Sequence, residues 1–460
     1  MGACVRCGWS RVVLVVVAVA AVGGLGRKSE AWEPAQGPLM TRWAADVDPA
    51  APLPEYPRPQ LVRSDWQNLN GLWDYAIAAA DAAQPAEWQG EILVPFPVES
   101  SLSGVMKRVS PEEQLWYRRT FTVPPGWQGR RVLLHFGAVD WHAKVFVNGQ
   151  EVGEHKGGYD PFSFDVTDAL VEGQQELVVA VADPTDAGFQ PRGKQVRRPK
   201  GIYYTPITGI WQTVWIEPVG TTHMERLSIR PDFDASAVEV LASGPGTGGP
   251  ARFEVEVLDG DEVVARDVTE QISSTRSLPP RLAPRLTVKL PGAKPWSPDS
   301  PHLYRLRITL SENGQVADRI ESYFGMRKIE VASDADGVRR LFLNGKPLFQ
   351  YGPLDQGFWP DGLYTAPTDE ALRFDIEFTK RVGFNMARKH VKVEPARWYH
   401  WCDKLGLLVW QDMPSGERSI GPNDSDIQRS PESAQQYEEE LRELIDDFGF
   451  VERGGVCHVR

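Results

Sequence analysis

The sequence predicts a multidomain protein in which two β-sandwich domains precede a region of alternating helices and strands. Short runs of alternating apolar and polar residues recur from Leu69 to Val219 and again from Thr221 to Glu330, with turn residues between them. From Asp369 to Met413 the apolar spacing becomes that of helices separated by short apolar runs. The length of 460 residues is sufficient for about three domains.

The first β region, residues 32–219, is predicted to be a sandwich or jelly roll. Its strongest hairpin signal is VFVNGQEVG, where Asn148-Gly149 separates two alternating runs. Many short strands joined by tight turns are typical of this architecture. The prolines in ILVPFPVES, residues 92–100, place that strand at a sheet edge or in a loop. The proline-rich stretch Pro49–Pro59 is expected to be a linker or an extended arm.

The second β region, residues 220–331, is predicted to be an immunoglobulin-like sandwich. AVEVLAS, ARFEVEVLD and RLTVKLPG alternate, and seven or so strands in about a hundred residues fit that fold. The segment WSPDSPHLY, residues 296–304, is expected to turn a corner between strands. No functional residue is expected in this domain.

Residues 332–460 show the pattern of an α/β barrel or a doubly wound sheet. A hairpin around Asn344-Gly345 is expected to close the bottom of a barrel, and Gly383 and Gly406 are expected to end helices. The elements predicted after it are a strand within 347–356, a helix over 369–382, a strand over 384–391, a helix over 395–405, a strand over 407–410 and a helix over 431–448. Gly449 is expected to stop the last helix, and GFVERGGVCHVR shows no strand pattern.

Polar residues follow the predicted strands at the ends where barrel proteins place their active sites. Arg388 and His390 lie toward the end of one strand, Asp412 ends the next, and Asp355 ends the first. Since neighbouring strands are about 4.8 Å apart, Arg388, Asp412 and Asp355 are predicted to converge in one concave site. The alternative is that Arg388 and Asp412 form a structural ion pair at the rim.

This segment resembles the first part of the catalytic barrel of family 2 glycoside hydrolases, which include β-galactosidases, β-glucuronidases and β-mannosidases. The residues that match the family pattern are Gly383, Asn385, Arg388, Cys402, Asp403, Gly406, Val409 and Asp412. The Trp-Gln-Asp ending at Asp412 is most similar to the mannosidase variant. His390 follows Arg388 by two residues, whereas many members have a spacing of three.

The two β regions resemble the preceding domains of the same family. LWYRRTF, VDWHAKVFVNG, GGYDPFSFDVT and GIWQTVWIEP are similar to its jelly-roll sugar-binding domain, and SYFGMRKIEV to its second domain. The resemblance implies that Asp183 contacts substrate hydroxyls; the alternative is a turn residue before Pro184. The implied substrate-binding residues are therefore Asp183, Asp355, Arg388, His390 and Asp412.

The resemblance further implies hydrolysis of β-linked O-glycosyl bonds, of the β-galactosidase type, without a cofactor. No metal ligand is assigned, and the sequence does not indicate whether a metal ion is required. A (β/α)8 TIM barrel needs eight units, so residues 332–460 are interpreted as an incomplete, truncated barrel, with a premature end or a shifted reading frame after Phe448. The two catalytic Glu residues of the family have no counterpart, so no catalytic residue is assigned and the chain is expected to be inactive. The alternatives are a non-catalytic carbohydrate-binding protein and a structural or adhesive sandwich protein.

The N-terminus predicts export. Arg6 and Arg11 precede an apolar run from Val12 to Val22, which is typical of a cleaved signal peptide within residues 1–31 and too short for a membrane span. A retained anchor is the alternative. After cleavage the protein is expected to be secreted or periplasmic, with no membrane partner, and only Cys402 and Cys457 remain, so no disulfide framework is predicted.

Composition argues against a nucleic-acid partner. The net charge is −12 and no basic stripe is present. The short basic run RRPK, Arg197–Lys200, is interpreted as a solvated loop. An oligosaccharide or glycoside is the expected partner, and the sequence indicates neither the particular sugar nor the oligomeric state.

Overall fold

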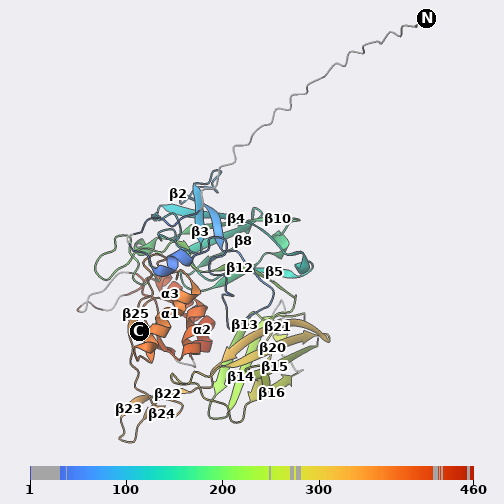
Figure 1. Cartoon of the computed structure of the whole chain (residues 1–460), viewed down its shortest axis with the longest axis vertical. Coiled ribbons are helices and arrows are strands. Elements are labelled where there is room, and N and C mark those ends of the chain that lie inside the picture. The colour runs from blue at the N-terminus through green and yellow to red at the C-terminus, as the bar shows by residue number, and fades with distance from the viewer. Residues whose placement is uncertain are drawn as a thin grey trace. The chain divides into compact units, whose positions relative to one another are not determined.

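The computed structural model describes Met1 and residues 32–37, 39–247, 250–269, 274–275, 281–417, 423, 425, 428–452 and 456–459 (Figure 1). Residues 33–460 form one compact unit. The predicted signal segment falls almost wholly on residues outside this description.

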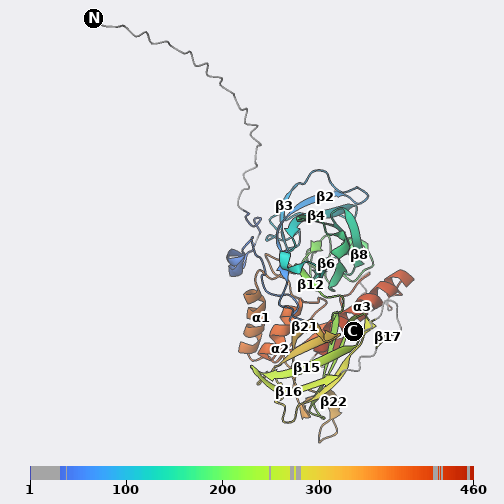
Figure 2. The same ribbon diagram turned by 90° about the vertical axis from the view of Figure 1, so that its right-hand side faces the viewer.

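Two antiparallel sheets build the first sandwich. Their strands are β1 (Gln67–Asn68), β2 (Gly71–Ala79), β3 (Gly90–Val94), β4 (Glu113–Thr122), β5 (Arg131–Phe136), β7 (His142–Val147), β8 (Gln150–Lys156), β9 (Phe162–Asp165), β10 (Gln174–Ala182) and β12 (Val214–Val219). One sheet has the order β3-β2-β4-β10-β7-β8 and the other β1-β12-β5-β9. Figure 2 labels β2, β3, β4 and β8 of the first sheet and β12 of the second. A short pair, β6 (Val139–Asp140) with β11 (Gly209–Ile210), lies beside them.

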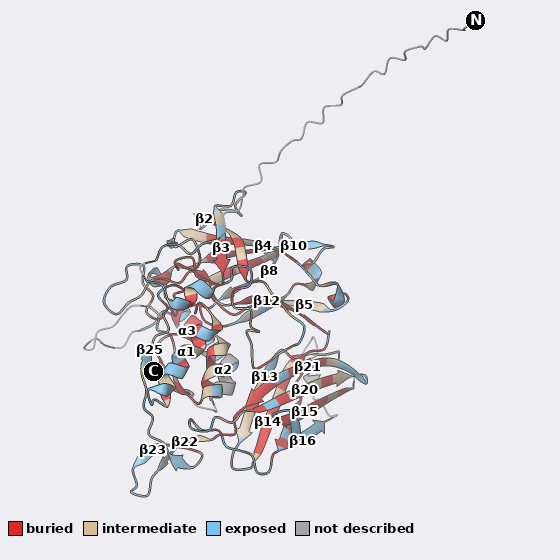
Figure 3. Ribbon diagram, viewed as in Figure 1, coloured by how far each residue is buried: buried red, intermediate tan, exposed pale blue. Residues whose placement is uncertain are grey.

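Inward-facing residues of both sheets form a single apolar core, which includes Trp73, Tyr117 and Phe136. Buried residues run along the strands of both sandwiches in Figure 3. The predicted hairpin is confirmed, because Asn148 and Gly149 join β7 to β8 with φ of 51° and 79°. These positive φ values at both central residues define a turn whose twist matches that of the strands. β3 is an edge strand that ends at Val94, directly before Pro95, which agrees with the predicted edge or loop.

The second sandwich also consists of two antiparallel sheets. Its strands are β13 (Arg226–Asp232), β14 (Ala237–Pro245), β15 (Ala251–Asp259), β16 (Glu262–Thr269), β17 (Ser274–Thr275), β18 (Arg281–Leu282), β19 (Arg285–Lys289), β20 (Tyr304–Glu312) and β21 (Gln315–Phe324). β13, β14, β17, β18 and β19 form one sheet, and β16-β15-β20-β21 the other. Phe253, Leu306 and Ile320 are buried between them.

A small antiparallel sheet connects the second sandwich to the α/β region. It comprises β22 (Ile329–Ser333), β23 (Arg339–Leu343) and β24 (Lys346–Pro347), with Asn344 and Gly345 at the turn. Leu343 packs in one apolar cluster with Met386 and Leu408, which begin two of the parallel strands. The hairpin therefore lies at the amino ends of these strands, as predicted for a barrel bottom.

The α/β region has four parallel strands in the order β25-β26-β27-β28. Its elements are β25 (Leu354–Asp355), α1 (Asp369–Arg381), β26 (Met386–Lys389), α2 (Ala396–Leu405), β27 (Leu408–Asp412), α3 (Pro431–Glu452) and β28 (Val456–Val459). Thr368 caps α1 by accepting a hydrogen bond from the Ala371 amide at 3.1 Å. Gly406 ends α2 with a φ of 80°. α1 and α2 pack against Ala387 and Val409 on one face of the sheet.

The prediction for the last twelve residues was wrong. α3 continues through Gly449 to Glu452, and β28 pairs in parallel with β27. A glycine inside a helix costs only about 1 kcal/mol, which a helix of 22 residues tolerates. The free edge of β27 offers unpaired backbone groups, and four residues containing two valines suffice to pair with them.

Candidate functional site

Asp412 is the centre of a polar network at the carboxyl end of β27. Its carboxylate accepts two hydrogen bonds from the Arg388 guanidinium, from Nε at 3.0 Å and Nη2 at 2.8 Å. His390 Nδ1 lies 2.7 Å from the same carboxylate. Asp412 is 3% exposed, whereas Arg388 and His390 are 35% and 22% exposed. Among the described residues, Arg388 Nη1 and His390 Nε2 have no hydrogen-bond partner, so both remain available to a ligand.

The strand register shows why only part of the predicted site converges. In parallel strands, paired residues point to the same face, and faces alternate along each strand. Arg388 pairs with Leu354 and Trp410, whereas Asp355 pairs with Lys389. Asp355 therefore ends its strand at the expected rim but points to the face that α1 and α2 cover. The side chains of Arg388 and Asp412 meet, and the prediction that Asp355 joins them was wrong.

Asp355 belongs to a separate, buried network. Lys389 Nζ donates to Asp355 at 2.6 Å and to Glu394 at 2.8 Å. Burial alone would raise the pKa of Asp355, but the Lys389 ammonium outweighs it and lowers that pKa. Lys392 Nζ donates to Glu394 at 2.9 Å and to the carbonyls of Gly357 and Tyr364, and burial lowers the pKa of this lysine to about 8. These contacts fix the segments that follow β25 and β26.

Asp183 lies inside the first sandwich and is 2% exposed. Its carboxylate accepts hydrogen bonds from the Thr185 amide at 2.7 Å, the Thr185 hydroxyl at 3.0 Å and the Thr208 hydroxyl at 3.0 Å. This arrangement corresponds to the alternative of a turn residue before Pro184, and the side chain does not reach the network around Asp412. Burial raises the pKa of Asp183 above its ordinary value.

A loop of the first sandwich extends to the rim where this network lies. The amides of Arg192 and Gly193 donate to the Ser415 carbonyl at 2.9 and 2.8 Å, just beyond the end of β27. Arg192 Nη2 donates to the Glu417 carbonyl at 2.9 Å. Sequence reasoning missed these residues; the available signal was the long stretch without a strand pattern between β10 and β11, which contains the basic run.

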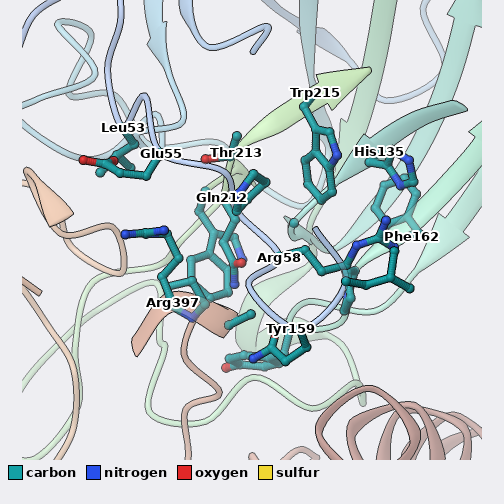
Figure 4. Close-up of a pocket in the computed structure, with 18 of the residues that line it drawn as sticks. Leu53, Glu55, Arg58, His135, Tyr159, Phe162, Gln212, Thr213, Trp215 and Arg397 are labelled. Atoms are coloured by element: carbon teal, nitrogen blue, oxygen red, sulfur yellow. The ribbon is translucent and has the colours of Figure 1, made fainter. Parts of the chain in front are cut away.

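A cavity of about 490 Å³ is formed elsewhere in the same compact unit, between the proline-rich arm, the two sandwiches and the α/β region (Figure 4). Its wall includes Glu55, Arg58, Gln212, Trp215 and Arg397, but none of the residues around Asp412. Arg58 pairs with Glu217 at 2.7 Å, and Arg397 with Asp369 at 2.6 Å. The positive charges of the wall are thus neutralised by neighbouring carboxylates.

Among the residues that the structure describes, no three His, Cys, Asp or Glu side chains are grouped so as to hold a metal ion. No helix there combines the length and apolarity needed to cross a bilayer.

The fold and the strand-end network together define a multidomain protein in which mostly-β domains carry a smaller α/β region with a polar site at its strand ends. Residues 66–203 match the sugar binding domain of glycosyl hydrolases family 2, and residues 222–327 match a second model of glycosyl hydrolases family 2. The chain belongs to glycosyl hydrolase family 2, which confirms the resemblance read from the sequence.

Curated relatives support this assignment. The β-galactosidase of Thermoanaerobacter pseudethanolicus is 28% identical over 313 residues, which cover 66% of this chain and 40% of the relative. A β-glucuronidase of Paenibacillus borealis is 26% identical over 385 residues, which cover 78% of this chain and 60% of the relative. The chain thus spans less than two thirds of the length of each of these relatives.

Solved structures show the same fold. A β-glucuronidase of Bacteroides uniformis aligns with a TM-score of 0.66 and 22% identity, covering 85% of this chain and 46% of that one. A β-D-glucuronidase of Dictyoglomus thermophilum aligns with a TM-score of 0.68 and 21% identity, covering 87% of this chain and 67% of that one.

Proposed function

We propose that this chain carries sugar-binding parts of a β-glycosidase of the galactosidase or glucuronidase type, and that the Arg388–His390–Asp412 network contacts the sugar. One observation carries the proposal: in a member of this hydrolase family, an unengaged guanidinium nitrogen of Arg388 and an unengaged ring nitrogen of His390 stand at the carboxyl ends of parallel strands, the place where barrel enzymes bind substrate. Asp412 fixes both groups, so their positions are set before a ligand arrives. A sugar hydroxyl is both a donor and an acceptor, so it suits the N–H of Arg388 and the ring nitrogen of His390.

We also propose that the chain as given does not hydrolyse glycosides, and that its four parallel strands correspond to part of an incomplete (β/α)8 barrel. Retaining hydrolysis requires a proton donor and a nucleophile whose carboxyl groups are about 5 Å apart. Asp412 is held by Arg388 and His390, and Asp355 by Lys389 with a lowered pKa. A carboxylate whose pKa is lowered by a neighbouring cation is a poor general acid, so Asp355 does not supply the leaving-group proton. Both oxygens of Asp412 are already engaged by Arg388 and His390.

The test combines turnover with binding. We expect no release of nitrophenol from the nitrophenyl β-galactoside, β-glucuronide or β-mannoside, and weak binding of methyl β-galactoside or methyl β-glucuronide in ligand-observed NMR. His390→Ala is expected to abolish that binding. His142→Ala is the matched control, because His142 is also 22% exposed and also pairs with one carboxylate, Glu154 at 3.0 Å.

Two outcomes would overturn these proposals. Turnover that disappears in Asp412→Asn would identify Asp412 as a catalyst instead of the group that positions Arg388 and His390. Binding that survives His390→Ala and is lost in His142→Ala would move the sugar site to the first sandwich, as expected for the alternative of a non-catalytic carbohydrate-binding protein.

We further propose that the protein is exported, to the periplasm or the medium, by its N-terminal segment. The support is the run of apolar residues after Arg11. Mass spectrometry of the protein from its native host is expected to show a mature N-terminus beyond Ala20, and an intact Met1 would refute export by a cleaved signal.

A further inference from the structure

The loop of the first sandwich that reaches the strand-end rim is attached there by its backbone. Pro191 forms a bridge with Gly416, next to the amide contacts of Arg192 and Gly193 with Ser415. A Cβ on Gly193 would come within 2.3 Å of the Val391 carbonyl, and its φ is +60°. Only glycine permits this approach, so the loop is fitted closely to the segment just past β26.

A second attachment lies at the other end of the loop. The rings of Tyr204 and Phe358 stack with centroids 4.1 Å apart and planes at 14°, and Phe358 follows β25. Between the attachments, the Val196 amide donates to the Tyr204 carbonyl at 3.1 Å and the Tyr204 amide to the Lys194 carbonyl at 2.9 Å. Residues 194–204 thus form a narrow loop whose tip lies near 197–201.

The tip is strongly basic. We call residues 194–200 the basic loop; it contains Lys194, Arg197, Arg198 and Lys200. Arg197 pairs with Asp186 at 2.7 Å, whereas the other three cations have no ion pair with any described residue. Arg198 and Lys200 are exposed. Arg108 adds a further cation, since its Nη1 donates to the Arg197 carbonyl at 3.1 Å.

This concentration of positive charge is unusual for the chain, whose net charge is −12. Unpaired surface cations repel one another, and a loop that gathers them beside a binding site raises the local concentration of anions. Arginine presents a fork of donors that matches a carboxylate, and lysine adds a point charge. The loop therefore has the chemistry of an anion-binding element, and both of its ends are attached beside the strand-end network.

We propose that the basic loop binds uronate carboxylates of an acidic oligosaccharide, on sugar units outside the one held by the Arg388–His390–Asp412 network. The inference rests on the proposed function, because it takes the strand-end network to be the place of the first sugar. A long nucleic acid is a poorer fit, since the loop contributes few cations and the rest of the chain repels a polyanion.

Calorimetric titration with two trisaccharides of equal size, trigalacturonate and the neutral galactotriose, tests the proposal on the full chain. We expect trigalacturonate to bind at least about tenfold more tightly, and the difference to shrink when salt is raised so that the screening length falls below about 10 Å. The double variant Arg198→Gln/Lys200→Gln is expected to bind both sugars alike. The matched control is Arg339→Gln/Lys346→Gln, which removes two exposed cations from the hairpin at the opposite ends of the strands.

The outcomes separate the two proposals. The role of the basic loop is overturned if the wild-type chain binds both sugars equally, or if the control variant loses as much affinity for trigalacturonate as the loop variant does. Either result leaves the proposed sugar site standing. Binding of neither sugar overturns the proposed sugar site as well. An oligodeoxynucleotide that carries the same number of charges and binds as tightly as trigalacturonate would show a general polyanion surface and would also overturn the inference.

Discussion

Glu99 offers a direct test of how burial controls the stability of the first sandwich. Its carboxylate accepts a hydrogen bond from the Thr208 amide at 2.9 Å, but its second oxygen, Oε1, is buried with no partner among the described residues. Burial raises the pKa of Glu99 from an ordinary value of 4.5 to about 8. The hydrogen bonds from Thr208 lower this pKa and the nearby Asp183 raises it, but burial is the largest cause. The folded domain therefore holds a proton that the unfolded chain releases.

The sign and size of the effect follow from this difference in pKa. Below about pH 4.5, Glu99 is protonated in both the folded and the unfolded state, so it adds no pH dependence to the free energy of unfolding. As pH rises toward 8, the unfolded state loses its proton while the folded state keeps it, so the free energy of unfolding falls. At 1.36 kcal/mol per pH unit, the whole interval corresponds to a loss on the order of 5 kcal/mol.

Glu99→Gln should remove this dependence, because the amide has a similar shape, still accepts from Thr208 and does not ionise. We expect the variant and the wild type to differ by less than about 1 kcal/mol near pH 5, and the variant to be more stable by about 3 kcal/mol or more near pH 8. Urea unfolding followed by tryptophan fluorescence at several pH values measures the difference. Glu91→Gln, at an exposed position of the same domain, is the control and should track the wild type.

Parallel pH profiles for the wild type and Glu99→Gln would refute the reasoning. They would mean that Glu99 is ionised in the folded domain despite its burial, stabilised by a group that the present contacts do not include. Burial also raises the pKa values of the nearby Asp140 and Asp183, so the wild-type profile should be steeper than Glu99 alone produces.

Three further predictions concern the α/β region. Gly406→Ala should destabilise this region by more than about 2 kcal/mol, because a Cβ would lie 2.4 Å from the Pro298 carbonyl. Gly383 also has a positive φ, but a Cβ there would meet nothing within 4 Å, so Gly383→Ala should cost only about 1 kcal/mol. Equal losses of stability in urea unfolding would contradict this prediction. Asp412→Asn should cost about 2 kcal/mol by freeing the Arg388 guanidinium, and a double-mutant cycle with Arg388→Met should show that the two losses are not additive. Ile376→Ala, 1% exposed in α1, should cost about 2–5 kcal/mol in thermal unfolding, and a cost below 1 kcal/mol would mean that α1 is not packed on the sheet.

Features fixed by local chemistry could be read from the sequence. Thr368 begins α1 because its hydroxyl accepts from an amide three residues on, and Gly406 ends α2 because it tolerates a left-handed conformation. Asn148-Gly149 makes its turn for the same local reason. Each depends on fewer than five consecutive residues, which is why the sandwich hairpin and the first two helices lie where they were predicted.

Features that depend on which strands pair with one another could not be read from the sequence. Whether Asp355 joins Arg388 depends on which residues of β25 and β26 are opposite one another. A shift of one residue in this pairing would move the Asp355 side chain to the other face of the sheet relative to Arg388. Residues 456–459 form a strand because β27 offers them an edge, which their own sequence does not reveal. The Arg197–Lys200 run reads as an ordinary solvated loop, and its sequence does not reveal that Gly193 and Tyr204 attach the two ends of that loop beside the strand-end rim.

The strand-end network also explains why one aspartate satisfies two interpretations made from sequence. Asp412 is a structural ion-pair partner, since both of its oxygens are hydrogen-bonded to Arg388. It is also the group that leaves one donor of Arg388 and one nitrogen of His390 unengaged on the face opposite α1 and α2. A buried carboxylate that is fully satisfied by its neighbours does not itself bind a sugar, but it holds its partners at fixed positions while one nitrogen of each remains unengaged. In the function we propose, the rim ion pair and the sugar-binding site are therefore one arrangement, in which Asp412 positions the groups and Arg388 and His390 make the contacts.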